Sequence, residues 1–215
     1  MTGTGRGHIV AVVPVRSLSG AKSRLGERLD AEERADLILA LLRRTVREAL
    51  DASRLEGVVV VSMDDELLRE ARAIGAASLL QATEGLNQGL DEARAGVRAE
   101  ATAVLVLPVD LPGISASALD ELVEAAERAR RDEPERPVVI LAPDHHGTGT
   151  NALLVAPPDA IPFLFGEGSR AAHASAARAA GASYVEVQGP LGFDLDTPED
   201  LLEADRRGLD HEAGR

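Results

Sequence analysis

Short apolar runs alternate along the chain with longer segments that mix apolar and charged residues. Five runs are clear strand candidates and two are weaker ones, at 8–15, 57–63, 102–109, 137–143 and 150–156, and at 77–81 and 183–187. Short apolar runs of this length are consistent with strands buried on both faces of a sheet. Their alternation with helical segments favours an α/β fold, with a mostly parallel central sheet and helices on both faces.

The segments between the runs have the pattern of amphipathic helices. We expect six helices, at 30–53, 64–74, 87–100, 116–132, 169–180 and 197–207. Asp30 can cap the first helix while Glu33 completes a capping box. Thr197-Pro198 is a hydroxyl cap followed by proline at the first helical position. No composition shift or internal repeat divides the chain, so we expect one domain over residues 1–215, with an ordered core at about 8–207.

The composition narrows the class of protein. A net charge of −13 argues against a surface for nucleic acid or anionic membranes, so neither partner is expected. The chain has no cysteine, which excludes disulfides and thiolate metal sites. Its N-terminal apolar run is too short for a signal peptide or membrane anchor, and we expect a cytoplasmic protein. A homodimer is left open.

The loop after the first apolar run, 16–29, combines small residues with cations. Lys22 is the only lysine of the chain, because the other 22 of its 23 basic residues are arginines. Ligands of open α/β sheets bind beyond the carboxyl ends of strands. Backbone amides of this loop could approach an anion there, with Arg16, Lys22 and Arg24 supplying charge. A compact ammonium suits a phosphate, although a solvated basic loop is the alternative.

Carboxylates follow apolar segments at two further places. Asp110 ends the run 104–109 and precedes Leu-Pro-Gly, where it could bind a divalent metal or simply open a turn. Asp194 and Asp196 alternate along an extended segment, so their side chains point the same way. Two such carboxylates repel each other unless a cation lies between them. Helix initiation beside Thr197 is an alternative explanation for Asp196.

Three segments rich in small or amide residues are further binding candidates. Gly-Thr-Gly-Thr at 147–150 and Phe-Gly-Glu-Gly-Ser at 165–169 could bind a phosphate or carboxylate through backbone amides. A β-turn and ordinary helix capping explain them as well. Asn87, at a helix start, could read a base edge or a ribose, or cap the helix. The five histidines show no zinc spacing and receive no role.

Taken together, a basic loop, separated carboxylates and small-residue anion sites are the groups that nucleotidyl transfer requires. That chemistry needs positioning and charge neutralisation and no covalent nucleophile. As a set, VPVRSLSGAKSRL, LNQGL, PVDLPGI, GTGTNALL, FGEGS and FDLDTPEDL resemble the guanylyltransferases of coenzyme F420 biosynthesis, over about residues 8–205. The resemblance implies a GT-A-like (Rossmann-like) nucleotidyltransferase fold. It also implies a reaction of GTP with phosphoenolpyruvate or 2-phospho-L-lactate that uses Mg²⁺ and releases pyrophosphate.

The resemblance also implies roles for individual residues. Lys22 would contact the phosphates of GTP as a catalytic residue, with Arg16 and Arg24 nearby. The nucleotide would be bound by Pro14, Ser17 and Asn87. The metal ligands would be Asp110, Asp194 and Asp196, and the carboxylate and phosphate of the acid would bind at Thr150, Gly166 and Ser169.

Four functional alternatives stay open at this point. The Arg- and Ala-rich composition is typical of bacterial proteins, and the bacterial branch favours phosphoenolpyruvate as the acceptor. The first alternative is 2-phospho-L-lactate, which shares the carboxylate and the phosphate. The second and third are a cytidylyltransferase and a sugar nucleotidyltransferase. The fourth is a GTP-binding regulatory protein without turnover, which would bind GTP and release no pyrophosphate.

Overall fold

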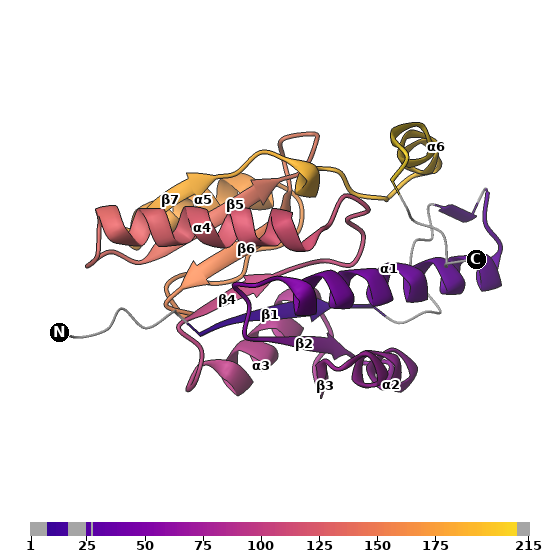
Figure 1. Cartoon of the computed structure of the whole chain (residues 1–215), viewed down its shortest axis with the longest axis horizontal. Helices are drawn as coiled ribbons and strands as arrows, with labels where there is room; N and C mark the ends of the chain where they lie inside the picture. The colour runs from indigo at the N-terminus through magenta and orange to yellow at the C-terminus, as the bar shows by residue number, and fades with distance from the viewer. Residues whose placement is uncertain (1–7, 17–24, 27, 210–215) are drawn as a thin grey trace.

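The computed structural model describes residues 8–16, 25–26 and 28–209. Within these residues, seven strands form one sheet in the order β3-β2-β1-β4-β6-β5-β7 (Figure 1). The strands are β1 (Ile9–Pro14), β2 (Gly57–Ser62), β3 (Ala77–Leu80), β4 (Ala103–Val106), β5 (Val138–Pro143), β6 (Thr150–Ala156) and β7 (Ser183–Glu186). Every apolar run that we expected to form a strand does so.

The sheet is mostly parallel, as predicted. Strand β6 is antiparallel to both β4 and β5, whereas the other neighbouring strands pair in parallel. A short turn joins β5 to β6, and such a connection can join only antiparallel strands. The chain runs outward from β1 to β3 and then returns to β4 beside β1. This reversal leaves a crevice at the carboxyl ends of β1 and β4, the usual binding place in such sheets.

Six α-helices are present in the described part of the chain. They are α1 (Ala31–Asp51), α2 (Asp65–Ile74), α3 (Leu86–Val97), α4 (Ala116–Asp132), α5 (Ser169–Ala179) and α6 (Pro198–Arg207). The predicted capping box is confirmed: Asp30 accepts from the backbone N–H of Glu33 at 2.9 Å, and Glu33 accepts from that of Asp30 at 2.8 Å. Thr197 caps α6, with Pro198 at its first position. These local signals explain why most predicted helix boundaries are nearly correct.

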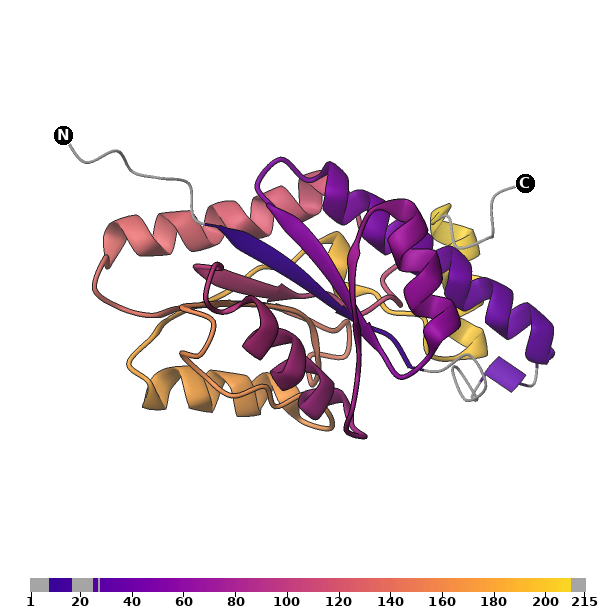
Figure 2. The same ribbon diagram turned by 90° about the horizontal axis from the view of Figure 1, so that it is seen from below.

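Alternate residues of each strand face opposite layers of helices. Ala11 and Val13 of β1 belong to a buried cluster with residues of α1, α2 and α4, whereas Val12 packs with α3 and α5. Figure 2 shows α3 and α5 on one side of the sheet and α1 and α4 on the other. Helix α6 packs outside α1 through a third cluster that includes Phe193 and Leu195. The prediction of helices on both faces is confirmed.

None of the helices in the described residues has both the length and the apolar character that a bilayer crossing requires.

Candidate active site

A cavity of about 540 Å³ opens at the carboxyl ends of β1 and β4. Because β6 is antiparallel to β4, its first residue lies at the same edge of the sheet. The segments that precede α5 and α6 complete the walls. Eight of the predicted site residues line this cavity, namely Pro14, Arg16, Asp110, Thr150, Gly166, Ser169, Asp194 and Asp196. The fold therefore brings together residues that are far apart along the chain.

Four predicted residues are not placed in this cavity. Lys22, Arg24 and Ser17 lie outside the described residues, so their roles stay predictions. Asn87 is described but is not among the lining residues. Its amide instead donates to the carbonyl of Phe165 at 3.0 Å and accepts from the N–H of Phe165 at 2.9 Å. The alternative that Asn87 caps α3 is wrong, since the cap position is held by Gly85.

Three aspartates form what we call the carboxylate wall: Asp110, Asp194 and Asp196. The backbone N–H of Leu195 donates to the carbonyl of Asp110 at 2.9 Å, which fixes the extended segment beside the end of β4. Phe193 and Leu195 are buried, and the two aspartates that alternate with them line the cavity. The predicted alternation of side chains along this segment is confirmed.

Asp194 is the member of the carboxylate wall whose charged form is disfavoured by its surroundings. Burial raises the pKa of Asp194, and the charges of Asp110 and Asp196 raise it further. The amide of Asn151, 3.3 Å from Asp194 Oδ1, and the ring of His145 oppose this rise without cancelling it. A positive charge among these carboxylates would relieve the repulsion.

The donor chemistry of the carboxylate wall fits a hard divalent cation. Mg²⁺ prefers oxygen ligands and is usually held by one or two carboxylates together with substrate phosphates and water. In the described part of the chain, no group of three or more His, Cys, Asp or Glu side chains is arranged to hold a metal ion. Mg²⁺ at this wall would take further oxygen ligands from substrate phosphates and water, as is usual for this ion.

The same cavity is lined by what we call the small-residue wall, formed by Thr150, Gly166 and Ser169. Gly166 has a φ of +132°, a conformation that side chains with a Cβ rarely adopt. Helix α5 begins at Ser169, and its cap residue Gly168 makes no side-chain cap hydrogen bond. The capping alternative therefore holds for this segment, with Gly168 at the cap position and no side-chain hydrogen bond. A helix N-terminus beside the cavity is a favourable place for an anion.

The turn before β6 does not provide the anion-binding amides that we expected. The N–H of Gly147 donates to the carbonyl of Asp144 at 3.0 Å, and that of Thr148 donates to the Asp144 carboxylate at 2.8 Å. Burial alone would raise the pKa of Asp144, but hydrogen bonds from the backbone of Gly149, Thr148 and Gly147 outweigh it and lower the pKa. The β-turn alternative is therefore correct here. Within 147–150, we had assigned Thr150 to the site, and Thr150 lines the cavity.

Sequence reasoning missed His173, which is completely buried in α5. Its Nε2 accepts from the N–H of Leu164 at 2.9 Å, and its Nδ1 lies 3.1 Å from Oγ1 of Thr150. Burial lowers its pKa to about 4, so the ring is neutral near pH 7. One sequence signal could have linked His173 to the site. It lies four residues after Ser169, so both side chains are on the same face of a helix.

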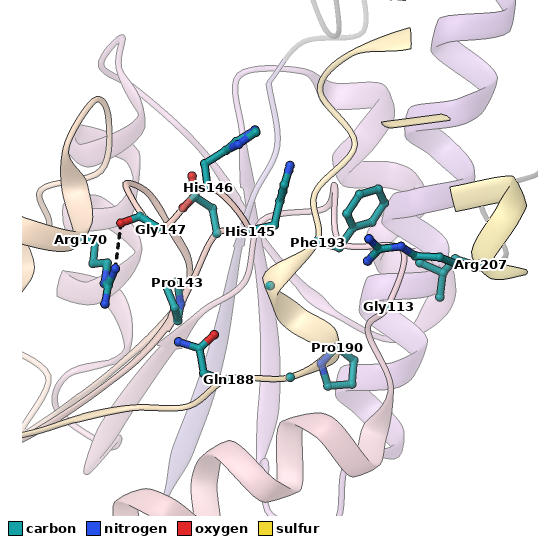
Figure 3. Close-up of a pocket in the computed structure, with 14 residues that line it drawn as sticks. Gly113, Pro143, His145, His146, Gly147, Arg170, Gln188, Pro190, Phe193 and Arg207 are labelled. Carbon is teal, nitrogen blue, oxygen red and sulfur yellow. Dashed lines mark hydrogen bonds between the residues drawn. The ribbon is translucent and has the colours of Figure 1, made fainter. Parts of the chain in front are cut away.

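Figure 3 shows the residues that line a second cavity, of about 420 Å³. Asp144 lines both cavities. None of the predicted site residues lines the second cavity. Arg170, at its edge, pairs with Glu186 at 2.7 Å and donates to the carbonyl of Gly147 at 2.9 Å. The pairing with Glu186 raises the pKa of Arg170 and lowers that of Glu186. This arginine therefore stabilises the turn before β6.

The fold and the lining of the first cavity together define a nucleotidyltransferase of GT-A-like fold. A solved structure titled as a nucleotidyl transferase from Methanothermobacter thermautotroptrophicus superposes with a TM-score of 0.68, at 19% identity, over 94% of this chain and 98% of that one. At that identity, the likeness shows the fold alone.

The family can also be stated. The family model described as "Guanylyl transferase CofC like" matches residues 9–213, and the chain belongs to this family. A curated relative from Rubrobacter xylanophilus, named phosphoenolpyruvate guanylyltransferase, is 46% identical over 93% of this chain and 95% of its own length. A relative of the same name from Sphaerobacter thermophilus is 46% identical over 90% and 91%. The resemblance drawn from the motifs is confirmed.

Proposed function

We propose that this enzyme transfers GMP from GTP to the phosphate of phosphoenolpyruvate. The products would be enolpyruvoyl-2-diphospho-5'-guanosine, a precursor in coenzyme F420 biosynthesis, and pyrophosphate. The names of the two relatives support this acceptor, because each matches at least nine-tenths of both chains. The structural observation that supports the proposal is that the carboxylate wall and the small-residue wall line one and the same cavity.

The reaction needs no nucleophile from the protein. A phosphate oxygen of the acid attacks the α-phosphorus of GTP, and a new phosphorus–oxygen bond forms. The bond from the α-phosphorus to the oxygen that bridges to the β-phosphorus breaks, and pyrophosphate leaves. Catalysis then depends on aligning the two substrates and neutralising their charges.

The two walls divide this work. Thr150, Gly166 and Ser169 would bind the carboxylate and phosphate of the acid and point one phosphate oxygen at the nucleotide. Asp110 and Asp194, with Asp196 as a further ligand, would hold Mg²⁺, which when bound neutralises charge on the phosphates of GTP. Asn151 and His145 keep Asp194 oriented toward this position.

The remaining residues would serve the nucleotide. Pro14 and Arg16 line the cavity beyond the end of β1, where the triphosphate would lie. Lys22, Arg24 and Ser17 follow in the same loop of the sequence, and we propose that the two cations neutralise charge as pyrophosphate leaves. A guanosine contact from Asn87 stays a prediction outside this proposal, because its amide is bonded to the backbone of Phe165.

Pyrophosphate release tests the proposed function. Purified protein with Mg²⁺ and GTP would be given phosphoenolpyruvate or 2-phospho-L-lactate in parallel, and CTP and ATP would replace GTP as controls. We expect release with GTP and phosphoenolpyruvate, and its loss in excess EDTA. Pyrophosphate release with 2-phospho-L-lactate and not with phosphoenolpyruvate would show that the proposed acceptor is wrong. Binding of GTP without pyrophosphate release in the presence of either acid would contradict the proposed catalysis and favour the regulatory alternative.

A further inference from the structure

His173 is a polar side chain in the protein interior, and both of its ring nitrogens have partners. It has no exposed surface, and the ring of Phe165 packs edge-on against it at 5.0 Å between centroids. One nitrogen contacts the backbone of Leu164 and the other contacts the hydroxyl of Thr150. A buried imidazole is costly unless both nitrogens are satisfied, and these two contacts satisfy it.

The contacts determine which nitrogen carries the proton. A backbone N–H can only donate, so Nε2, which lies 2.9 Å from the nitrogen of Leu164, must present its lone pair. The neutral ring then carries its proton on Nδ1, which lies 3.1 Å from Oγ1 of Thr150. His173 therefore donates to the hydroxyl of Thr150. The hydroxyl accepts this bond, and its own hydrogen is directed elsewhere.

The cavity is where that hydrogen can be used. Thr150 lines the cavity together with Gly166 and Ser169. A hydroxyl whose oxygen already accepts a hydrogen bond is pre-oriented as a donor, and an incoming carboxylate or phosphate offers only acceptors. Without His173, the hydroxyl would be free to rotate and would lose this orientation.

We propose that His173 is a positioning residue for the acid substrate, because it fixes the hydroxyl of Thr150 as a hydrogen-bond donor toward the cavity. This inference rests on the proposed function, in which Thr150 binds the acid. His173 also holds the N–H of Leu164, and Asn87 holds the next residue, Phe165, from the side of α3. Two side chains thus fix the segment that leads into Gly166.

A matched pair of substitutions separates the two contacts of His173. In His173→Asn, the amide nitrogen can take the place of Nδ1 and donate to Thr150, whereas the contact with Leu164 is lost. In His173→Gln, the amide oxygen can take the place of Nε2 and accept from Leu164, whereas the donor to Thr150 is lost. Both variants remove the ring, and His173→Asn loses one methylene more than His173→Gln, so thermal melting must be compared for the two.

The readout is the KM for phosphoenolpyruvate measured beside the KM for GTP. We expect His173→Gln to raise the KM for the acid about tenfold, and His173→Asn to raise it less than about threefold. The KM for GTP should change less than about twofold in either variant. Equal effects of the two variants on the acid, or a parallel rise in the KM for GTP, would overturn the proposal.

Thr150→Val supplies the second arm, because valine keeps the shape of threonine without its hydroxyl. If His173 acts through Thr150, combining each variant with Thr150→Val should reduce the difference between them. The KM for phosphoenolpyruvate of His173→Gln and that of His173→Asn should then differ by less than about twofold. An undiminished difference in that background would overturn the proposal. Thermal melting of each variant identifies any that does not fold.

A measurement without substrate keeps this inference separable from the proposed function. The ¹⁵N shifts of labelled histidine in the unliganded protein report the tautomer, and His173 is assigned by the signal missing from His173→Asn. We expect the proton on Nδ1, and a proton on Nε2 would overturn the proposal even in an active enzyme. If the tautomer is as expected but the wild-type protein releases no pyrophosphate with phosphoenolpyruvate, the proposed function fails and the assigned role of Thr150 fails with it.

Discussion

The two walls of the cavity are stabilised in opposite ways. In the carboxylate wall, burial and the charges of Asp110 and Asp196 disfavour the charged form of Asp194 and raise its pKa. The small-residue wall is held by the neutral side chains of His173 and Asn87. In our proposal, the first wall binds a cation and the second wall binds the acid. Substitutions in the two walls should therefore affect activity and stability differently.

The largest effect is expected for Asp194→Asn. Removal of one carboxylate should weaken Mg²⁺ binding and lower kcat/KM about 100-fold or more. The same change removes a buried negative charge, so the metal-free variant should melt at the same temperature as the wild type or higher. Pyrophosphate release over a Mg²⁺ titration and thermal melting in EDTA measure the two effects.

Asp159→Asn is the matched control for that change. Asp159 is exposed and does not line the cavity. The control should leave both the Mg²⁺ titration and the melting temperature unchanged. An unchanged Mg²⁺ titration in Asp194→Asn would contradict the assignment of the carboxylate wall to the metal.

The next largest effect is on how the free energy of unfolding depends on pH. This dependence should have opposite signs for His173, which supports the small-residue wall, and for Asp194 of the carboxylate wall. Burial lowers the pKa of His173 from 6.5 to about 4, so between these values the unfolded chain binds a proton that the folded protein does not. The free energy of unfolding should therefore fall as the pH falls, by about 2 kcal/mol between pH 7.5 and 5. The raised pKa of Asp194 acts in reverse, since the folded protein then takes up its proton at a higher pH than the unfolded chain.

Urea unfolding in EDTA at several pH values tests this pair of signs. The stability advantage of the wild type over His173→Phe should shrink by about 2 kcal/mol on going from pH 7.5 to 5. Relative to Asp194→Asn, the wild type should instead gain stability as the pH falls. Differences that do not change with pH would contradict the protonation states described for both walls.

A smaller effect is expected for Gly166→Ala, which strains the small-residue wall. The φ of +132° at Gly166 disfavours a Cβ, although no atom lies within 4 Å of the position that it would take. We expect kcat/KM for phosphoenolpyruvate to fall about tenfold, because the backbone beside the acid must shift. The rate of pyrophosphate release at limiting phosphoenolpyruvate measures it.

Gly181→Ala separates strain from function. Gly181 also has a positive φ, +64°, with open space at the Cβ position, and it does not line the cavity. Both substitutions should lower the melting temperature, and Gly166→Ala alone should impair use of the acid. An equal loss of activity in both variants would show that strain acts through stability.

Local patterns and the resemblance predicted most of the fold and the residues of both walls. The strands follow from apolar runs, the start of α1 from its capping box, the start of α6 from the Thr197-Pro198 cap, and the orientation of Asp194 and Asp196 from their alternation. Contacts across the fold were not predictable in this way. His173 meets Thr150 over 23 positions and Asn87 meets Phe165 over 78, and no periodicity encodes such pairs. The hydrogen bonds that Asp144 accepts from the turn at 147–149 are local, but they too were not predictable, because they depend on where β5 ends.

The smallest effect is expected for Asn87→Ala, and it decides between two roles for this residue. Loss of the amide leaves the N–H and carbonyl of Phe165 without their present side-chain partner, and the segment before Gly166 should loosen. We expect the KM for phosphoenolpyruvate to rise about threefold, with the KM for GTP unchanged. Gln88→Ala, which removes an exposed amide from the same helical turn, should change neither value. A rise in the KM for GTP alone would contradict this expectation and would instead support the predicted contact with guanosine.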